Sequence, residues 1–120
     1  MSPLLDGLLC KRYPEIFKMR HAPMTETAMC WGFECGDGWF ELIDCLCASI
    51  MDNPPPPVAV QVKEKFGGLR FYVDSASETV WGLIEMAEAF SFRVCEICGA
   101  LGKRTDGHYI RVRCPIHWGK

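Results

Sequence analysis

The sequence lacks any apolar run close to the roughly 18–20 residues that a membrane-spanning helix requires. It also lacks the order of a secretory signal, because its first basic residues follow the opening apolar stretch, which Asp6 interrupts, rather than precede it. These two absences argue against membrane insertion and against secretion. We therefore predict a cytoplasmic protein that makes no contact with a membrane.

Histidine is scarce, and neither His21 nor His108 has neighbouring residues that support a catalytic base. A cysteine nucleophile at Cys35, just ahead of a predicted helix, is conceivable because a helix N-terminus lowers the pKa of a thiol. Such a nucleophile would still need a nearby histidine. A cysteine at the end of a strand is the simpler interpretation, and we expect no enzymatic activity.

Charge is nearly balanced over the whole chain but unevenly distributed along it. The formal net charge of the 120 residues is −2. Residues 1–92 carry seven basic and thirteen acidic side chains, whereas residues 93–120 carry six basic and two acidic ones. The length suits one domain with a small appendage. We predict an acidic body over residues 1–92 and a basic tail over residues 93–120 that packs on it.

Apolar residues at helical spacing predict three helices, from Ser2-Pro3 to Tyr13, over residues 38–52 and over residues 76–91. Ser75-Ala-Ser-Glu78 fits a capping box at the start of the third helix. Glycine inside a helix costs about 1 kcal/mol relative to alanine. Gly82 therefore suggests that another element packs closely against the third helix.

Three short strands are predicted, over residues 28–35, 58–64 and 69–74. The last two alternate apolar and polar side chains, and the pair Gly67-Gly68 between them suits a hairpin turn. Together with the helices, these strands predict an α+β fold in which a small mixed or antiparallel sheet is covered by two to three helices.

Eight cysteines are many for a chain of this length, and four metal-binding side chains fall in one pattern. Cys95 and Cys98 form a knuckle, and Cys114 and His117 follow after fifteen residues. Three thiolates and one imidazole are a standard set for tetrahedral structural zinc. We predict one structural zinc ion in a stapled C-terminal hairpin, with His108 as the alternative fourth ligand. The remaining cysteines are predicted to be buried free thiols that behave as small hydrophobes, with a second metal site as the alternative: Cys10, Cys30, Cys35, Cys45 and Cys47.

Three segments together resemble a group of small phage and prophage proteins: Cys35 to Phe40, Val62 to Tyr72, and Cys95 to Gly99. The resemblance extends over residues 28–117. It implies a phage origin and a setting in the host cytoplasm, and it transfers no catalytic residue. Small phage proteins of this size are often antagonists of host defence complexes, such as anti-CRISPR proteins. By that analogy the expected partner is a host protein complex.

Two kinds of binding compete as the function. The first is binding to a host protein, for which tryptophans are suitable contacts and Trp118 is the one expected at the surface. The second is binding of nucleic acid by the basic tail, with Arg111 and Arg113 sharing one strand face beside Tyr109. The tail residues assigned to partner binding are Lys103, Arg104, Tyr109, Arg111, Arg113 and Trp118.

Overall fold

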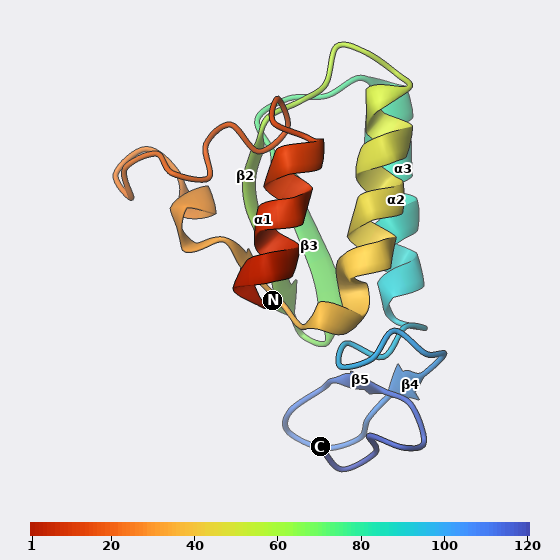
Figure 1. The fold of residues 1–120 in the computed structure, drawn as a ribbon. Helices are drawn as coiled ribbons and strands as arrows, with labels where there is room; N and C mark the ends of the chain where they lie inside the picture. Colours follow the sequence, from red (N-terminus) through yellow and green to blue (C-terminus); the bar gives the residue numbers. More distant parts are fainter.

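The computed structural model describes residues 1–120 and has the predicted α+β class. Three helices are present, α1 (Pro3–Arg12), α2 (Phe40–Met51) and α3 (Glu78–Ser91). A three-stranded sheet has the order β1 (Phe33–Glu34), β2 (Ala59–Lys65), β3 (Gly68–Val73), with β1 parallel and β3 antiparallel to β2. Figure 1 shows α2 and α3 antiparallel and side by side, with residues 93–120 below them. No helix is long and apolar enough to cross a bilayer.

The core lies between the sheet and the helices. It contains Leu9 of α1, Ile43 and Ile50 of α2, Phe71 of β3 and Ile84 of α3, all of which are fully or almost fully buried. The first helix begins as predicted, because Ser2 Oγ accepts a hydrogen bond from Leu5 N at 3.4 Å and Pro3 occupies the first turn.

The hairpin between β2 and β3 is confirmed, but its turn lies one residue earlier than predicted. Lys65 pairs with Gly68, so the two turn residues are Phe66 and Gly67, with φ of 52° and 86°. Two residues with positive φ match the right-handed twist of the flanking strands. Gly68 serves a different purpose, because a Cβ there would lie 2.3 Å from the ring of Phe92.

The prediction of a strand over residues 28–35 is largely wrong. Residues Ala28–Trp31 form the 3₁₀ turn η1, and only Phe33 and Glu34 pair with β2. Thr27 Oγ1 accepts a hydrogen bond from Met29 N at 3.0 Å, which caps this turn, and Gly32 then reverses the chain with φ of 75°. Local capping therefore overrides the strand preference of the aromatic residues.

Two details of the third helix also differ from the prediction. The residue that caps α3 is Ser77, whose Oγ accepts a hydrogen bond from Val80 N at 3.2 Å, rather than Ser75. Ser75 N instead donates to Asp74 Oδ1 at 2.7 Å. No element packs against Gly82, since a Cβ at this exposed position would meet nothing within 4 Å.

Candidate metal centre

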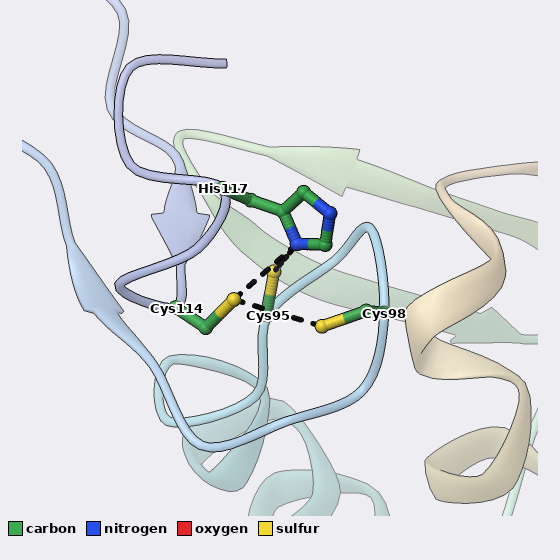
Figure 2. Close-up of side chains that lie close together, drawn as sticks. All are labelled: Cys95, Cys98, Cys114 and His117. Atoms are coloured by element: carbon green, nitrogen blue, oxygen red, sulfur yellow. Dashed lines mark hydrogen bonds between the residues drawn. The ribbon is translucent and has the colours of Figure 1, made fainter.

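The knuckle of residues 95–98 is shaped by backbone hydrogen bonds that close a tight turn. Gly99 N donates to Cys95 O at 2.8 Å, and Cys95 N donates to Ala100 O at 2.7 Å. Gly99 has φ of 84°, a conformation that glycine adopts without steric cost. This turn brings the side chains of Cys95 and Cys98 to one side of the loop (Figure 2).

A small hairpin carries the second pair of side chains back to the knuckle. Strand β4 (Lys103–Arg104) pairs antiparallel with β5 (Val112–Arg113). Thr105 closes the loop between them, because its N–H donates to Arg111 O at 2.8 Å and its Oγ1 accepts from Arg111 N at 3.0 Å. Cys114 follows directly after β5, and a turn places His117 beside it.

The four predicted ligands come together, with their ligand atoms all within 4.8 Å of one another. Cys98 Sγ lies 3.7 Å from Cys114 Sγ, and His117 Nδ1 lies 3.3 Å from Cys114 Sγ and 3.7 Å from Cys95 Sγ. Metal bonds of about 2.0–2.3 Å in a tetrahedron require ligand atoms roughly 3.3–3.8 Å apart. The three distances therefore fit one metal ion enclosed by these side chains, and His108 is not part of the group.

The environment of Cys95 favours its thiolate form. Burial raises the pKa of this thiol, but backbone N–H donors from Cys114, Cys98 and Ile97, together with the His117 side chain, outweigh it and lower the pKa to about 6. The thiolate is the form that binds metal. Cys95 and Cys114 are buried, whereas Cys98 is exposed, so the centre is accessible from the side of Cys98.

One of the two residues between the knuckle cysteines, Glu96, attaches the tail to the body. Glu96 Oε2 accepts a hydrogen bond from Gly36 N, and Glu96 O accepts one from Gly38 N, both at 2.8 Å. Trp39 Nε1 donates to Val94 O at 2.9 Å. A Cβ on Gly38 would lie 2.2 Å from Cys95 O, so the two segments touch through their backbones. We call this contact between residues 36–39 and 94–99 the clasp.

The clasp was not predicted from the sequence. Its signal is the run Gly36-Asp-Gly-Trp39, which combines two glycines with an indole that requires a hydrogen-bond partner when buried. Taken alone, the glycines predict only a turn before α2, and the structure places them in and next to the 3₁₀ turn η2 (Asp37–Trp39). The absence of side chains is what allows the knuckle to approach.

The side chains assigned to partner binding do not all reach the surface. Lys103, Arg104, Tyr109 and Trp118 are exposed, as is Arg111, whose guanidinium lies 5.7 Å from the Tyr109 ring centre. Arg113 is an exception, because only 6% of it is exposed. Its Nη1 donates to Val112 O at 2.9 Å and lies 3.8 Å from Glu96 Oε1. The prediction that Arg113 and Arg111 share a solvent-facing surface is therefore wrong.

Tryptophan exposure also differs from the prediction that Trp118 would be the one exposed indole. Trp31 and Trp81 are exposed as well, and Trp39 is fully buried. Trp81 lies on α3 and Trp31 in η1, and neither belongs to the buried core. Both can therefore act as surface contacts.

The other cysteines are free thiols, and no further group of three metal-binding side chains forms. The prediction that they are buried holds for Cys35 and Cys47 but is wrong for Cys45, which is exposed, and Cys10 and Cys30 are half-buried. Burial raises the pKa of Cys35 to about 12, so the helix that follows does not convert it to a thiolate nucleophile. The arrangement of the chain can thus hold a metal ion near the C-terminus. Comparisons with protein-family models, curated proteins and solved structures found no match to this chain.

Proposed function

We propose that Cys95, Cys98, Cys114 and His117 bind one zinc ion whose role is structural. The observation that carries this proposal is the closed group of four ligand atoms within 4.8 Å of one another. Thiolates select soft or borderline metals, and a set of three cysteines and one histidine is typical of zinc. Four protein ligands fill a tetrahedron, which leaves no position for a substrate or an activated water. We accordingly propose that the protein is not an enzyme.

Elemental analysis of the purified protein tests this assignment. We expect about one zinc per chain, and substoichiometric zinc in Cys95→Ser and Cys114→Ser. Cys45→Ser, which changes an exposed thiol outside the group, is the matched control and should retain full zinc content. A wild-type protein that contains no zinc when purified and does not bind added zinc would contradict the proposal.

The zinc-stapled protein acts, in this proposal, by binding another protein. Leu101 and Trp118 line one hollow of the tail, and exposed apolar residues that gather in this way mark interaction sites. Large apolar side chains remain exposed over the whole tail. They are Ile97, Leu101, Tyr109, Ile110, Ile116 and Trp118. The resemblance to small phage proteins suggests a host protein complex as the partner and inhibition of host antiviral defence, in the manner of an anti-CRISPR protein, as the consequence.

A phage-plating assay tests this consequence directly. Expression of the protein in a bacterial strain that carries an active defence system should restore plaque formation, and capture on the tagged protein should recover a component of that system. Cys95→Ser, expressed at the same level, shows whether the effect requires the folded tail. Capture of no partner, with no effect on plating in any defence-carrying strain, would contradict the proposal.

Binding of nucleic acid is the second candidate, supported by the exposed cations of the hairpin, of which Arg111 lies over the Tyr109 ring. Lys103, Arg104 and Arg111 are all accessible in the hairpin, and aromatic rings beside cations suit single strands. The acidic body and a sequence pI of about 5.9 oppose this function. A salt titration of oligonucleotide binding by wild type and by Arg104→Ala/Arg111→Ala tests it, because each lost phosphate contact lowers the salt dependence. Absent or salt-insensitive binding would exclude this candidate.

A further inference from the structure

Beside their core-facing sides, α2 and α3 expose several large apolar side chains. A helix that covers a core on one side is expected to be polar on the other. On α3, however, 68% of Met86 and 42% of Phe90 are exposed, although Ile84 and Ala87 already supply the core contacts. Monomers seldom expose such neighbouring apolar residues without a function. These exposed apolar side chains therefore require an explanation beyond packing.

These residues border a groove between the two helices, which run side by side in Figure 1. The groove has a volume of about 270 Å³. We call it the α2–α3 groove, and the residues that define it are Leu42, Cys45 and Leu46 on α2 and Leu83, Met86 and Phe90 on α3. Each set recurs at steps of three or four, so each helix contributes one continuous stripe to the wall.

The groove continues toward the metal centre. A second hollow of about 570 Å³ shares Leu42, Cys45 and Phe90 with it and extends to Asp37 and Cys98. The combined surface runs along α2 and ends at the clasp. Two antiparallel helices with an apolar channel between them are suited to receive a third helix through its i, i+3, i+4 and i+7 side chains.

The two helices that border the groove carry acidic side chains and no basic ones. Residues 22–62 and 71–92, which include all of α2 and α3, contain no lysine, arginine or histidine. Two of the acidic residues have partners, since Asp44 pairs with Arg12 at 3.0 Å and Glu88 accepts a hydrogen bond from Phe71 N at 2.9 Å. Glu41 and Asp52, at the two ends of α2, are exposed and form no ion pair. Each lies one helical turn from a residue that lines the groove, Cys45 and Ser49 respectively, which leaves an acidic rim along α2.

We propose that the α2–α3 groove binds a basic amphipathic helix of the partner protein, an inference that rests on the proposed protein-binding function. Apolar side chains of that helix fill the channel, and lysine or arginine residues beside them face Glu41 and Asp52. A second copy of this chain is a poorer occupant in a two-fold arrangement, because the acidic rims would then face each other.

Calorimetric titration with synthetic peptides tests the proposal on the full-length zinc protein. The probe is an 18-residue helical peptide with leucine at i, i+3, i+4 and i+7 positions and lysine elsewhere. Two matched peptides serve as controls, one with glutamate in place of lysine and one with the leucines and lysines scrambled. We expect binding of the first peptide at about micromolar concentration, at least about tenfold weaker binding of the scrambled one, and none of the acidic one.

Variants of the protein locate the binding site. Met86→Ala/Phe90→Ala should weaken binding of the basic peptide at least about tenfold, and Glu41→Gln/Asp52→Asn should weaken it and reduce its salt dependence. Leu4→Ala/Met24→Ala is the matched control, since both residues are more than two-thirds exposed outside the groove, and it should bind like wild type. Equal binding of basic and scrambled peptides, equal binding by wild type and the Met86/Phe90 variant, or no binding of the helical peptide overturns the proposal.

The same variant separates this inference from the proposed function. A host complex captured equally by wild type and by Met86→Ala/Phe90→Ala would preserve the protein-binding function and remove the groove from it. A dimer of the wild-type chain that the same substitutions dissociate would assign the groove to a second copy and overturn the proposal. Reduced capture by this variant, together with unchanged capture by Leu4→Ala/Met24→Ala, supports it.

Discussion

Residues 1–92 and residues 93–120 are built on different principles. The body encloses a cluster of 20 buried hydrophobic residues, to which the tail contributes only Val94. In the tail the other buried residues are Cys95, Val112, Arg113 and Cys114, which lie at or beside the candidate metal ligands. A segment with so little apolar burial cannot offset its conformational entropy by packing alone. We therefore expect the tail to depend on metal binding and on the clasp, and the body to depend on neither.

Removal of the metal should have the largest effect, because it should destabilise the tail and leave the body intact. Structural zinc in finger peptides contributes about 10–16 kcal/mol of apparent binding free energy, and loss of one thiolate removes much of it. In Cys95→Ser, or after chelation, we expect β4 and β5 to lose amide-exchange protection while α2 and α3 keep theirs. Hydrogen exchange resolved by residue measures this, with Cys45→Ser as the control. If the tail kept its amide-exchange protection after complete removal of the metal, its fold would not depend on the metal.

Gly38→Ala tests the junction between the two parts. The added Cβ would lie 2.2 Å from Cys95 O and 2.7 Å from Cys98 N, and backbone atoms cannot move aside as a flexible side chain can. Overpacking of this kind costs about 1–3 kcal/mol. Thermal and denaturant unfolding should show a loss of that size, and zinc affinity should fall with it. A Gly38→Ala variant as stable as wild type would mean that residues 36–39 and 94–99 are not in tight backbone contact.

Ser77→Ala affects the body alone. Removal of an N-cap hydroxyl costs about 1 kcal/mol, and Ser77 Oγ accepts the hydrogen bond from Val80 N. Ser75→Ala is the matched control, because Ser75 uses its backbone rather than its side chain here, and its effect should be close to zero. Denaturant unfolding of both variants checks the assignment. Equal losses would restore the capping box predicted from the sequence.

Gly82→Ala gives the smallest expected change, and it is a gain. The position is helical and exposed, and nothing lies within 4 Å of the added Cβ. Alanine should stabilise the body by about 0.5–1 kcal/mol. An increase in the denaturant midpoint with unchanged zinc content measures it and shows that the body can be stabilised without affecting the tail. A loss of stability in the Gly82→Ala variant would indicate a close neighbour at this site after all.

The metal ligands and the three helices could be predicted from sequence because their signals are local. The Cys95/Cys98 knuckle is encoded within four residues, and helical spacing is readable within one helix. The strand over residues 28–35 could not be distinguished from a 3₁₀ turn, since the same apolar run suits either. Thr27 and Gly32 decided the outcome through a cap and a positive φ.

The clasp and the position of Arg113 could not be derived from local patterns. Gly36 and Glu96 are 60 residues apart, and their contact depends on how the whole chain folds. Alternation predicts Arg113 beside Arg111, but β5 contains only Val112 and Arg113, and Glu96 lies close enough to attract a buried guanidinium. Two-residue strands are too short for alternation to determine which side chains face the solvent.

The buried indole of Trp39 at the junction has an optical consequence. The other three tryptophans, Trp31, Trp81 and Trp118, are largely exposed, so only Trp39 is shielded from water. Emission at short wavelength that resists quenching by acrylamide can therefore be attributed to this one residue. Because its N–H reaches Val94 O, detachment of the tail would shift that emission to longer wavelength. The chain thus carries an intrinsic fluorescent reporter of its own assembly, and rapid mixing with a chelator could time the separation of its two parts.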